Sequence, residues 1–359
     1  MIFFDGIIFR ISPHGGISRI FMELWRRWEM VNTSGVAFIT PDVKLPVKER
    51  LERINYSGLR PRRLFWRGEM NRAYRRVKPD IFISTYYTLS PDDKSKQIAV
   101  IPDMIDELYF NSSWSDHALI SRKNKIAHQA TALIAISHKT KEDILSFYQD
   151  MPESRIRVMT LAASEIFRPM LKKELARKIF PRPFILFVGR RGNYKNFSTL
   201  LQAYAGNSRI IRDFELVVID DQPWKKEEVD IINRANLRSR IHLIHNVSDQ
   251  DLVLFYQQAR VFIFPSRYEG FGMPLLESAA CGTPVIANAS ASLVEIGENA
   301  VLYFSGPDEV SSLSTQLDKI CFDDALHLEY SQRGLEQSAK YSWDKFTQQF
   351  DELMGSLGL

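Results

Sequence analysis

The chain has few cysteines and no long hydrophobic run. Cys281 and Cys321 are the two cysteines among 359 residues, too few for a disulfide framework, which fits a reducing cytoplasm. No uninterrupted apolar stretch reaches the roughly 18 residues that indicate a membrane-spanning helix. Residues 1–6 lack a basic leader and a cleavage site, so we expect a strand there rather than a signal peptide. The sequence therefore favours a cytoplasmic protein without a membrane span.

Internal repeats and low-complexity tracts are also missing. A chain of 359 residues is long for one hydrophobic core, so two domains are expected. Apolar runs of strand length alternate with amphipathic helical patterns twice along the chain, which is typical of parallel sheets covered on both faces. The predicted fold class is α/β, with two doubly wound Rossmann-like domains at residues 1–168 and 169–342. An amphipathic helix is expected within residues 343–359, with Trp343, Phe346 and Phe350 on one side.

The predicted elements alternate regularly in both halves. Strands of the first half are expected at residues 2–4, 36–40, 81–85, 98–102, 131–137 and 157–159. Strands of the second half are expected at residues 184–188, 216–219, 241–245, 261–264, 285–287 and 301–304. The expected helices include residues 17–29, 117–129, 140–148, 171–179, 197–204, 225–234, 249–258 and 310–320.

Positive charge is concentrated in the first half of the chain. Residues 1–170 hold 26 Lys and Arg against 19 Asp and Glu. Between residues 53 and 78, with Phe65 and Trp66 among them, nine basic side chains face the single acid Glu69: Arg53, Arg60, Arg62, Arg63, Arg67, Arg72, Arg75, Arg76 and Lys78. Such a segment can lie on an anionic membrane surface or bind a phosphorylated acceptor. One alternative is a solvated helix face. Contact with nucleic acid is another, but we do not expect it.

Residues 265–277 place two carboxylates, Glu269 and Glu277, around a glycine-rich turn. The apolar run at residues 261–264 predicts a buried strand before the turn, and Pro274 suits the first turn of a helix after it. Backbone amides exposed at a helix N-terminus bind a diphosphate, and carboxylates accept hydrogen bonds from vicinal hydroxyls. This combination indicates a nucleotide-sugar site, whose turn and helix start are formed by Phe271, Gly272, Met273, Pro274 and Leu275.

This stretch resembles the Glu-x7-Glu signature of the retaining glycosyltransferase family 4, the group 1 glycosyltransferases, which has the GT-B fold. The continuation at residues 278–287 is also similar to that family. The resemblance implies that Glu277 binds the ribose hydroxyls and that Glu269 binds the hydroxyls of the transferred sugar. It also implies that residues 169–342 bind the donor, that residues 1–168 form the acceptor side, and that the terminal helix crosses back to the first domain.

The turn at residues 188–196 is similar to the family's glycine turn with basic residues and a Lys-Asn pair. The resemblance implies that Lys195 and one arginine neutralise the departing diphosphate. Arg190 and Arg191 compete for this role, and we favour Arg190. Cations placed where negative charge develops are a large catalytic contribution. A solvated basic turn is the alternative.

Two further loops resemble family segments that reach the substrates. Gly15 and Gly16 begin a helix near the N-terminus, where the family has its Gly-Gly loop, and Asn246 with Val247 resembles the loop whose backbone meets the nucleobase. The neighbouring His14 is expected to be a loop residue rather than a base. Asp103 matches the family's aspartate beside the transferred sugar. Its neighbour Pro102 stands where many relatives have histidine. The resemblance therefore says less about the acceptor side of the mechanism than about the donor side.

Several polar residues are better explained as helix caps than as ligands. Ser137 or Thr140 is expected to cap the last helix of the first domain. Ser248 with Asp251 three residues later predicts a capping box, although Asp249 and Asp251 also form the Asp-x-Asp metal motif of another glycosyltransferase fold. No metal and no other cofactor is therefore expected.

The sequence thus predicts a metal-independent retaining transfer of a hexose from a nucleotide-diphosphate sugar to a glycan or lipid-linked acceptor, in the synthesis of a surface polysaccharide. A UDP-glucose-like donor is the first expectation and GDP-mannose the next, both from family frequency. A glycosidase also uses two carboxylates, but the diphosphate site and Lys195 would have no role on a neutral glycan. A nucleotide-sugar epimerase on the same fold and an inactive donor-binding protein are the remaining alternatives.

Overall fold

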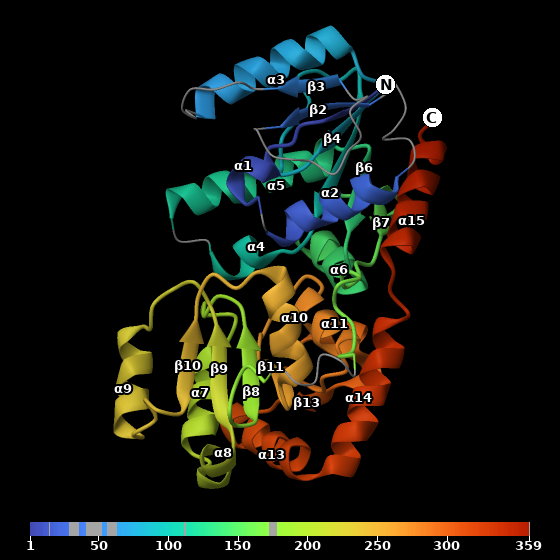
Figure 1. Cartoon of the computed structure of the whole chain (residues 1–359). Helices are drawn as coiled ribbons and strands as arrows, with labels where there is room; N and C mark the ends of the chain where they lie inside the picture. The colour runs from blue at the N-terminus through green and yellow to red at the C-terminus, as the bar shows by residue number, and fades with distance from the viewer. Residues whose placement is uncertain are drawn as a thin grey trace. The chain divides into compact units, whose positions relative to one another are not determined.

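The computed structural model describes residues 1–13, 15–28, 36–40, 52–55, 63–110, 113–171 and 178–358. It contains two parallel sheets with helices against their faces (Figure 1), so the predicted α/β class with two doubly wound sheets is confirmed. The chain separates into two compact units, residues 1–161 with 343–359, and residues 162–342. The predicted domain boundary at residue 168 lies in the segment between the last strand of the first sheet and the first strand of the second.

The first unit is built on a seven-stranded sheet with the order β3-β2-β1-β4-β5-β6-β7. The chain begins in an inner strand, β1, adds β2 and β3 on one side and then crosses to β4 on the other side. The carboxyl ends of β1 and β4 therefore flank the point where the strand order reverses. The strands are β1 (Ile2–Phe4), β2 (Val36–Thr40), β3 (Glu52–Asn55), β4 (Ile81–Ser84), β5 (Lys96–Ile101), β6 (Ala132–Ala135) and β7 (Ile156–Val158). The helices are α1 (Ile8–Ile11), α2 (Gly16–Arg27), α3 (Arg63–Val77), α4 (Ile105–Tyr109), α5 (Trp114–Gln129), α6 (His138–Phe147) and α15 (Trp343–Ser356).

The second unit repeats the scheme with six parallel strands in the order β10-β9-β8-β11-β12-β13, so β8 and β11 flank its reversal point. The strands are β8 (Phe184–Val188), β9 (Glu215–Ile219), β10 (Ile241–Ile244), β11 (Val261–Phe264), β12 (Val285–Asn288) and β13 (Leu302–Phe304). The helices are α7 (Phe197–Ala205), α8 (Ser208–Asp213), α9 (Lys226–Arg234), α10 (Asp249–Gln258), α11 (Met273–Ala280), α12 (Ala291–Gly297), α13 (Glu309–Phe322) and α14 (Asp324–Ser338).

The central strands are buried on both faces, which explains their uninterrupted apolar sequences. All four residues of β11 are at most 1% exposed, and β9 is buried along its whole length. Side chains of β8, β9, β11 and the helices α7 and α13 form one continuous core in this unit. The strand ends of this rigid core therefore hold their following loops in fixed positions.

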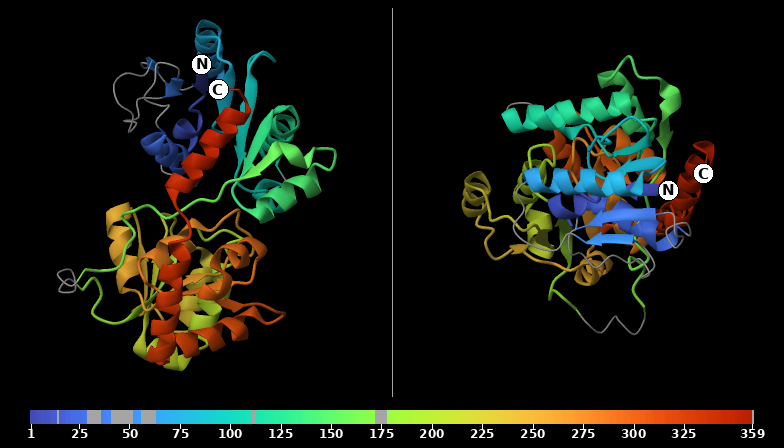
Figure 2. Two further views of the ribbon diagram at one scale, coloured as in Figure 1. Left: turned by 90° about the vertical axis from the view of Figure 1, so that its right-hand side faces the viewer. Right: turned by 90° about the horizontal axis from the view of Figure 1, so that it is seen from above.

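The terminal helix α15 belongs to the first unit, as the resemblance implied (Figure 2). Phe350 packs edge-on against Trp28, with 5.0 Å between ring centroids, and Trp28 Nε1 donates a hydrogen bond to Asp351 at 3.2 Å. Trp343 and Phe346 are buried beside Phe350. The apolar side of this helix thus covers α2.

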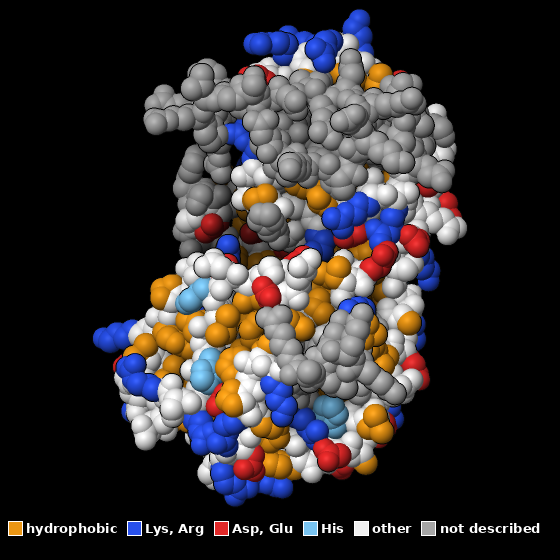
Figure 3. All heavy atoms as spheres, viewed as in Figure 1, with side chains coloured by type: hydrophobic (Ala, Val, Ile, Leu, Met, Phe, Trp, Pro, Cys, Tyr) orange, Lys and Arg blue, Asp and Glu red, His pale blue; other side chains and the backbone are white. Residues whose placement is uncertain are grey.

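Helix α3 contains the described part of the basic segment. Met70, Ala73 and Tyr74 are buried against Phe3 and Phe82 of the sheet. Basic side chains gather on the outer side of the helix (Figure 3), where the exposed ones are Arg67, Arg72, Arg75, Arg76 and Lys78. The remainder of the segment at residues 56–62, the loop residue His14 and most of the helix expected at residues 171–179 lie outside the described residues. None of the described helices is long and apolar enough to cross a bilayer.

Candidate functional site

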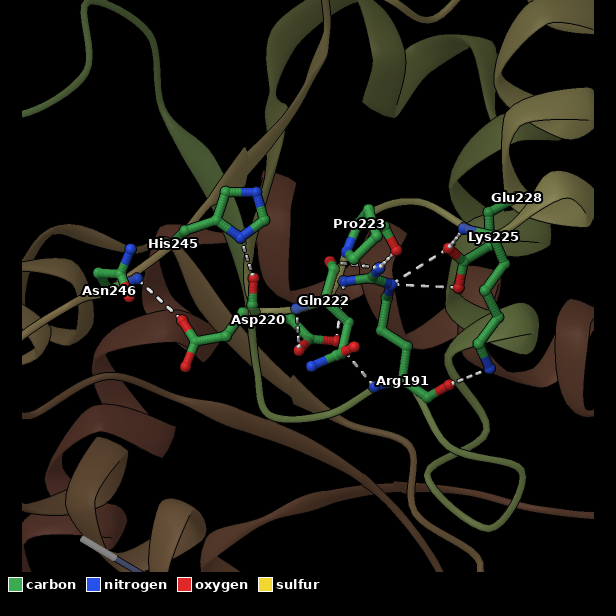
Figure 4. Close-up of polar contacts among 9 residues, drawn as sticks. Arg191, Asp220, Gln222, Pro223, Lys225, Glu228, His245 and Asn246 are labelled. Atoms are coloured by element: carbon green, nitrogen blue, oxygen red, sulfur yellow. Dashed lines mark hydrogen bonds and ion pairs between the residues drawn. The ribbon is translucent and has the colours of Figure 1, made fainter.

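The loop after β8 is anchored by Arg191, which lies in a buried ionic network (Figure 4). Arg191 Nη1 pairs with Asp220 at 2.8 Å, and its Nε pairs with Glu228 at 3.1 Å. The guanidinium also lies over the Trp224 ring, 4.8 Å from its centroid. Arg190, one residue earlier, is exposed. Arg191 therefore has a structural role in this loop, while the Arg190 side chain remains accessible to a ligand.

Lys195 and Glu269 meet at the reversal point of the second sheet, although they follow different strands. Lys195 Nζ lies 2.5 Å from Glu269 Oε1, and the Glu269 side chain is largely buried. The Lys195 ammonium also lies over the rings of Tyr194 and Phe264, at 5.2 and 5.6 Å from their centroids. The structure thus brings together the cation and the carboxylate that the sequence predicted for the phosphate and the sugar.

Gly272 begins α11 in a conformation that glycine favours. Its φ is 101°, and a Cβ there would lie 2.6 Å from Leu293 Cδ2. Leu275 N–H donates back to the Gly272 carbonyl at 2.9 Å, while Met273 and Pro274 are partly exposed at the start of the helix. The turn therefore leads directly into a helix N-terminus, where backbone amides favour a bound anion. Phe271 is buried, with its ring edge-on to Tyr341.

Glu277 lies about one turn into α11 and is 4% exposed. Tyr256 Oη donates a long hydrogen bond of 3.4 Å to Glu277 Oε2. Both carboxylates of the Glu-x7-Glu pair are thus buried, Glu269 in the loop before α11 and Glu277 within the helix.

The loop before α10 holds Asn246 and Val247 at the carboxyl end of β10. Asn246 has φ 54°, and its backbone N–H donates to Asp221 Oδ1 at 2.8 Å. His245 Nδ1 lies 2.6 Å from the Asp220 carbonyl oxygen (Figure 4). Ser248 caps α10 by accepting a hydrogen bond from Asp251 N–H at 3.1 Å, which is one half of the predicted capping box. Within the described ranges no group of His, Cys, Asp and Glu could hold a metal ion, and the expectation of metal-independent chemistry stays a prediction.

The candidates of the first unit lie at the ends of β1 and β5. Gly15 and Gly16 begin α2, and a Cβ on Gly15 would collide with Ser12 Oγ. Asp103 Oδ1 accepts a hydrogen bond from Ile105 N–H at 3.0 Å and so orders the start of α4. Ser137 caps α6 by accepting from Thr140 N–H at 2.9 Å, as the sequence predicted.

Several charged residues around these positions were not predicted from the sequence. Lys123, which is fully buried, donates to the Asp103 carbonyl at 3.2 Å and pairs with Asp106 and Glu107 at 3.0 and 2.8 Å. Asp220 of the second unit was also not predicted as a residue of the site. It directly follows an apolar strand, and this position could have indicated it. Glu309 was also missed, because the sequence gives no sign that it lies near Lys195.

Comparisons with known proteins identify similar families and folds. Residues 172–337 match the family model described as glycosyl transferases group 1. O-antigen chain mannosyltransferase B of Escherichia coli is 29% identical over 227 residues, which are 61% of this chain and 59% of that protein. The chain therefore spans about three fifths of the length of this relative.

Solved structures share the fold at low sequence identity. WaaG, a glycosyltransferase involved in lipopolysaccharide biosynthesis, superposes with a TM-score of 0.77 at 16% identity, over 98% of this chain and 99% of that one. Anabaena HepE in complex with UDP and glucose superposes with a TM-score of 0.76 at 14% identity, over 99% of both chains. The predicted family resemblance is confirmed: the chain has the GT-B fold, and residues 172–337 of its second unit match the model of the group 1 glycosyl transferases.

Proposed function

We propose that this chain transfers a hexose from a nucleotide-diphosphate sugar to a glycan or lipid-linked glycan, in the synthesis of a surface polysaccharide. The observation that carries the proposal is the Lys195–Glu269 pair beside the N-terminus of α11, at the carboxyl ends of β8 and β11. A cation and a helix N-terminus suit a diphosphate, and a carboxylate suits sugar hydroxyls. The names of the Escherichia coli relative and of WaaG support a polysaccharide of the O-antigen or lipopolysaccharide type.

The chemistry of each side chain suits a different part of the donor. Lys195, the exposed Arg190 and the amides at the start of α11 stabilise the negative charge that develops on the departing diphosphate. Glu269 orients the transferred sugar through its hydroxyls, and Glu277 holds the ribose. The leaving phosphate then accepts the proton of the acceptor hydroxyl on the same face of the sugar, so the anomeric configuration is retained and no separate general base is needed.

The names of similar proteins suggest which sugar is transferred. The sequence relative is named as a mannosyltransferase, while the HepE structure contains UDP and glucose. Because the first is the closer in sequence, at 29% identity against 14%, we propose mannose from GDP-mannose as the first donor to test and UDP-glucose as the second.

The exposed side of α3 supports an additional contact with an anionic membrane. Arg67, Arg72 and Arg75 are exposed on this helix, whereas Met70, Ala73 and Tyr74 are buried in the core. Each basic residue near such a surface contributes on the order of 1 kcal/mol, and lipid-linked acceptors are found at that surface. We therefore propose reversible peripheral attachment at the inner face of the membrane.

Release of nucleoside diphosphate from a donor panel tests the proposed function. Purified protein is incubated in EDTA with GDP-mannose, UDP-glucose and related sugars, with water or a lipid-linked glycan fraction as acceptor. We expect release from one donor, and a drop on the order of 10²- to 10³-fold for Lys195→Ala. Lys226→Ala, an exposed lysine of α9, is the matched control. An epimerised sugar with no release, or activity restored only by a divalent metal, would contradict the proposal.

A further inference from the structure

Glu309, the first residue of α13, receives hydrogen bonds from two loops and from the end of one strand of the second unit. Its Oε2 accepts from Asn196 Nδ2 at 3.1 Å and pairs with Arg267 Nη2 at 2.6 Å. Its Oε1 accepts from Asn288 Nδ2 at 2.9 Å. Asn196 and Arg267 lie in the loops after β8 and β11, and Asn288 is the last residue of β12, so one carboxylate joins two loops and a strand end at the same edge of the sheet.

The first of these loops is the turn that presents Lys195. Asn196 directly follows Lys195, is 3% exposed and has φ 53°, a left-handed conformation that asparagine tolerates. Thr199 Oγ1 donates to Asn196 Oδ1 at 2.8 Å, which leaves the amide nitrogen directed at Glu309. The oxygen and the nitrogen of the Asn196 amide are therefore both hydrogen-bonded. These bonds also fix the neighbouring backbone, which directs Lys195.

The second loop presents Glu269. Arg267 lies two residues before Glu269, and its backbone N–H donates to the Tyr194 carbonyl at 2.8 Å, which joins the two loops directly. The guanidinium of the same residue reaches Glu309. Burial would raise the pKa of Glu309, but the hydrogen bonds from Arg267, Asn196 and Asn288 together lower it below its ordinary value. The carboxylate is thus ionised at neutral pH, as a charge-assisted network requires.

We propose that Glu309 is a positioning residue that holds the Lys195 turn and the Glu269 loop in register. Its hydrogen bonds with Asn196 and Arg267 connect it to the neighbours of Lys195 and Glu269, and we propose that it acts through these neighbours. The two groups approach to 2.5 Å although they follow separate strands, and the Glu309 network fixes the backbone on both sides of this approach. The inference rests on the proposed function, because it assigns to this network the geometry needed for transfer.

Glu309→Gln tests the proposal with the smallest change of shape. The amide nitrogen of the glutamine is itself a donor and would face one of the three groups that donate to Glu309. At least one of these hydrogen bonds is therefore lost. We expect kcat to fall by on the order of 10²-fold, because small misplacements of reacting groups have effects of this size, while the KM of the donor and the Kd of free nucleotide change by less than about threefold. Adding Arg267→Gln to Glu309→Gln should lower kcat little further, because both changes break the same connection.

Asp308→Asn is the matched control, since it removes one negative charge from the same helix start. Asp308 caps α13 by accepting from Ser311 N–H at 3.0 Å, and asparagine also caps well. This variant should keep the wild-type kcat. Equal losses in both variants, or a Glu309→Gln enzyme with wild-type kcat, would overturn the proposal.

A crystal structure of Glu309→Gln separates this inference from the proposed function. If wild-type protein releases no nucleoside diphosphate, the proposed function fails, but the network is still tested by the separation of Lys195 Nζ and Glu269. We expect that separation to lengthen from 2.5 Å beyond hydrogen-bonding distance, or the two loops to shift. An unchanged pair and unchanged loops in the variant would show that Glu309 does not position them.

Discussion

At the scale of single residues, the adjacent Arg190 and Arg191 lie in different environments, and we expect different roles for them. Arg191 is buried with Asp220 and Glu228, and its side chain is 1% exposed. Removing one partner of a buried ion pair leaves uncompensated charge, so we expect Arg191→Ala to lower the free energy of unfolding by about 3–5 kcal/mol in urea denaturation. Arg190→Ala should change it by less than about 0.5 kcal/mol, as for most surface substitutions, yet lower turnover. Similar stability losses in both variants would contradict these roles.

The lowered pKa of Glu309 predicts an acid-dependent contribution to stability. Since the pKa is lower in the folded than in the unfolded state, the contribution is present above the unfolded pKa of about 4.3 and is lost as the pH falls through the lower folded value. The stability difference between wild type and Glu309→Gln should therefore shrink as the pH is lowered from 6 towards 3. Urea denaturation at several pH values measures this, with Glu336→Gln, an exposed position of α14, as control. A difference that is constant with pH would be contrary to our expectation.

The sequence predicted the central pair of the site but not the residues that support it. Lys195 lies in one motif, and Glu269 with Glu277 in another, and each motif has strand, glycine and helix signals among its own neighbouring residues. Glu309 lies 40 residues after Glu269 in the chain, and only the order of β8, β11 and β12 in the sheet brings it close. Arg190 was favoured over Arg191 from the sequence, but only the structure showed that Arg191 is buried with Asp220 and Glu228, because burial at a strand end depends on what packs above it. The assignment of individual ligand-binding residues stays a prediction.

At the scale of elements, the start of α11 depends on Gly272. A side chain there would be strained at φ 101° and would approach Leu293 Cδ2 to 2.6 Å. We expect Gly272→Ala to lower the free energy of unfolding by about 1–3 kcal/mol and to weaken nucleotide binding, since the helix start must shift. Gly355→Ala in α15, where a Cβ meets nothing within 4 Å, should be neutral or slightly stabilising. Unchanged stability and nucleotide affinity of Gly272→Ala would refute this reading of the turn.

The elements best predicted from sequence were the buried parallel strands, because a strand covered on both faces is apolar throughout. Strand β3 was not predicted: its sequence, Glu52–Asn55, lies at the edge of the sheet and contains polar residues. Helix α15 was predicted from its apolar side, but only the structure identified α2 as the surface that it covers. Sequence periodicity thus shows which face of an element is buried, while the partner of that face depends on the tertiary fold.

At the scale of the whole molecule, charge is distributed unevenly between the two units, and α3 contains much of the excess in the first. Sedimentation with vesicles of increasing anionic lipid content tests the proposed membrane contact. We expect salt-sensitive binding that is lost when Arg67, Arg72 and Arg75 are replaced by Ser. The control replaces three exposed basic residues of the second unit, Lys226, Arg234 and Lys319. Binding that is absent at low salt, or equally weakened by both sets, would leave α3 as a solvated helix face.

The central claim, that the second unit binds a nucleotide sugar at the ends of β8 and β11, is tested most directly by calorimetric titration of free GDP and UDP. We expect one nucleotide to bind wild-type protein, and Glu277→Gln to weaken that binding by roughly 1.5–3 kcal/mol, because the ribose hydroxyls lose a charged acceptor. Glu269→Gln should bind the nucleotide normally and lose turnover. No binding of either nucleotide to wild type, or an affinity that depends on Glu269 and not on Glu277, would contradict the account.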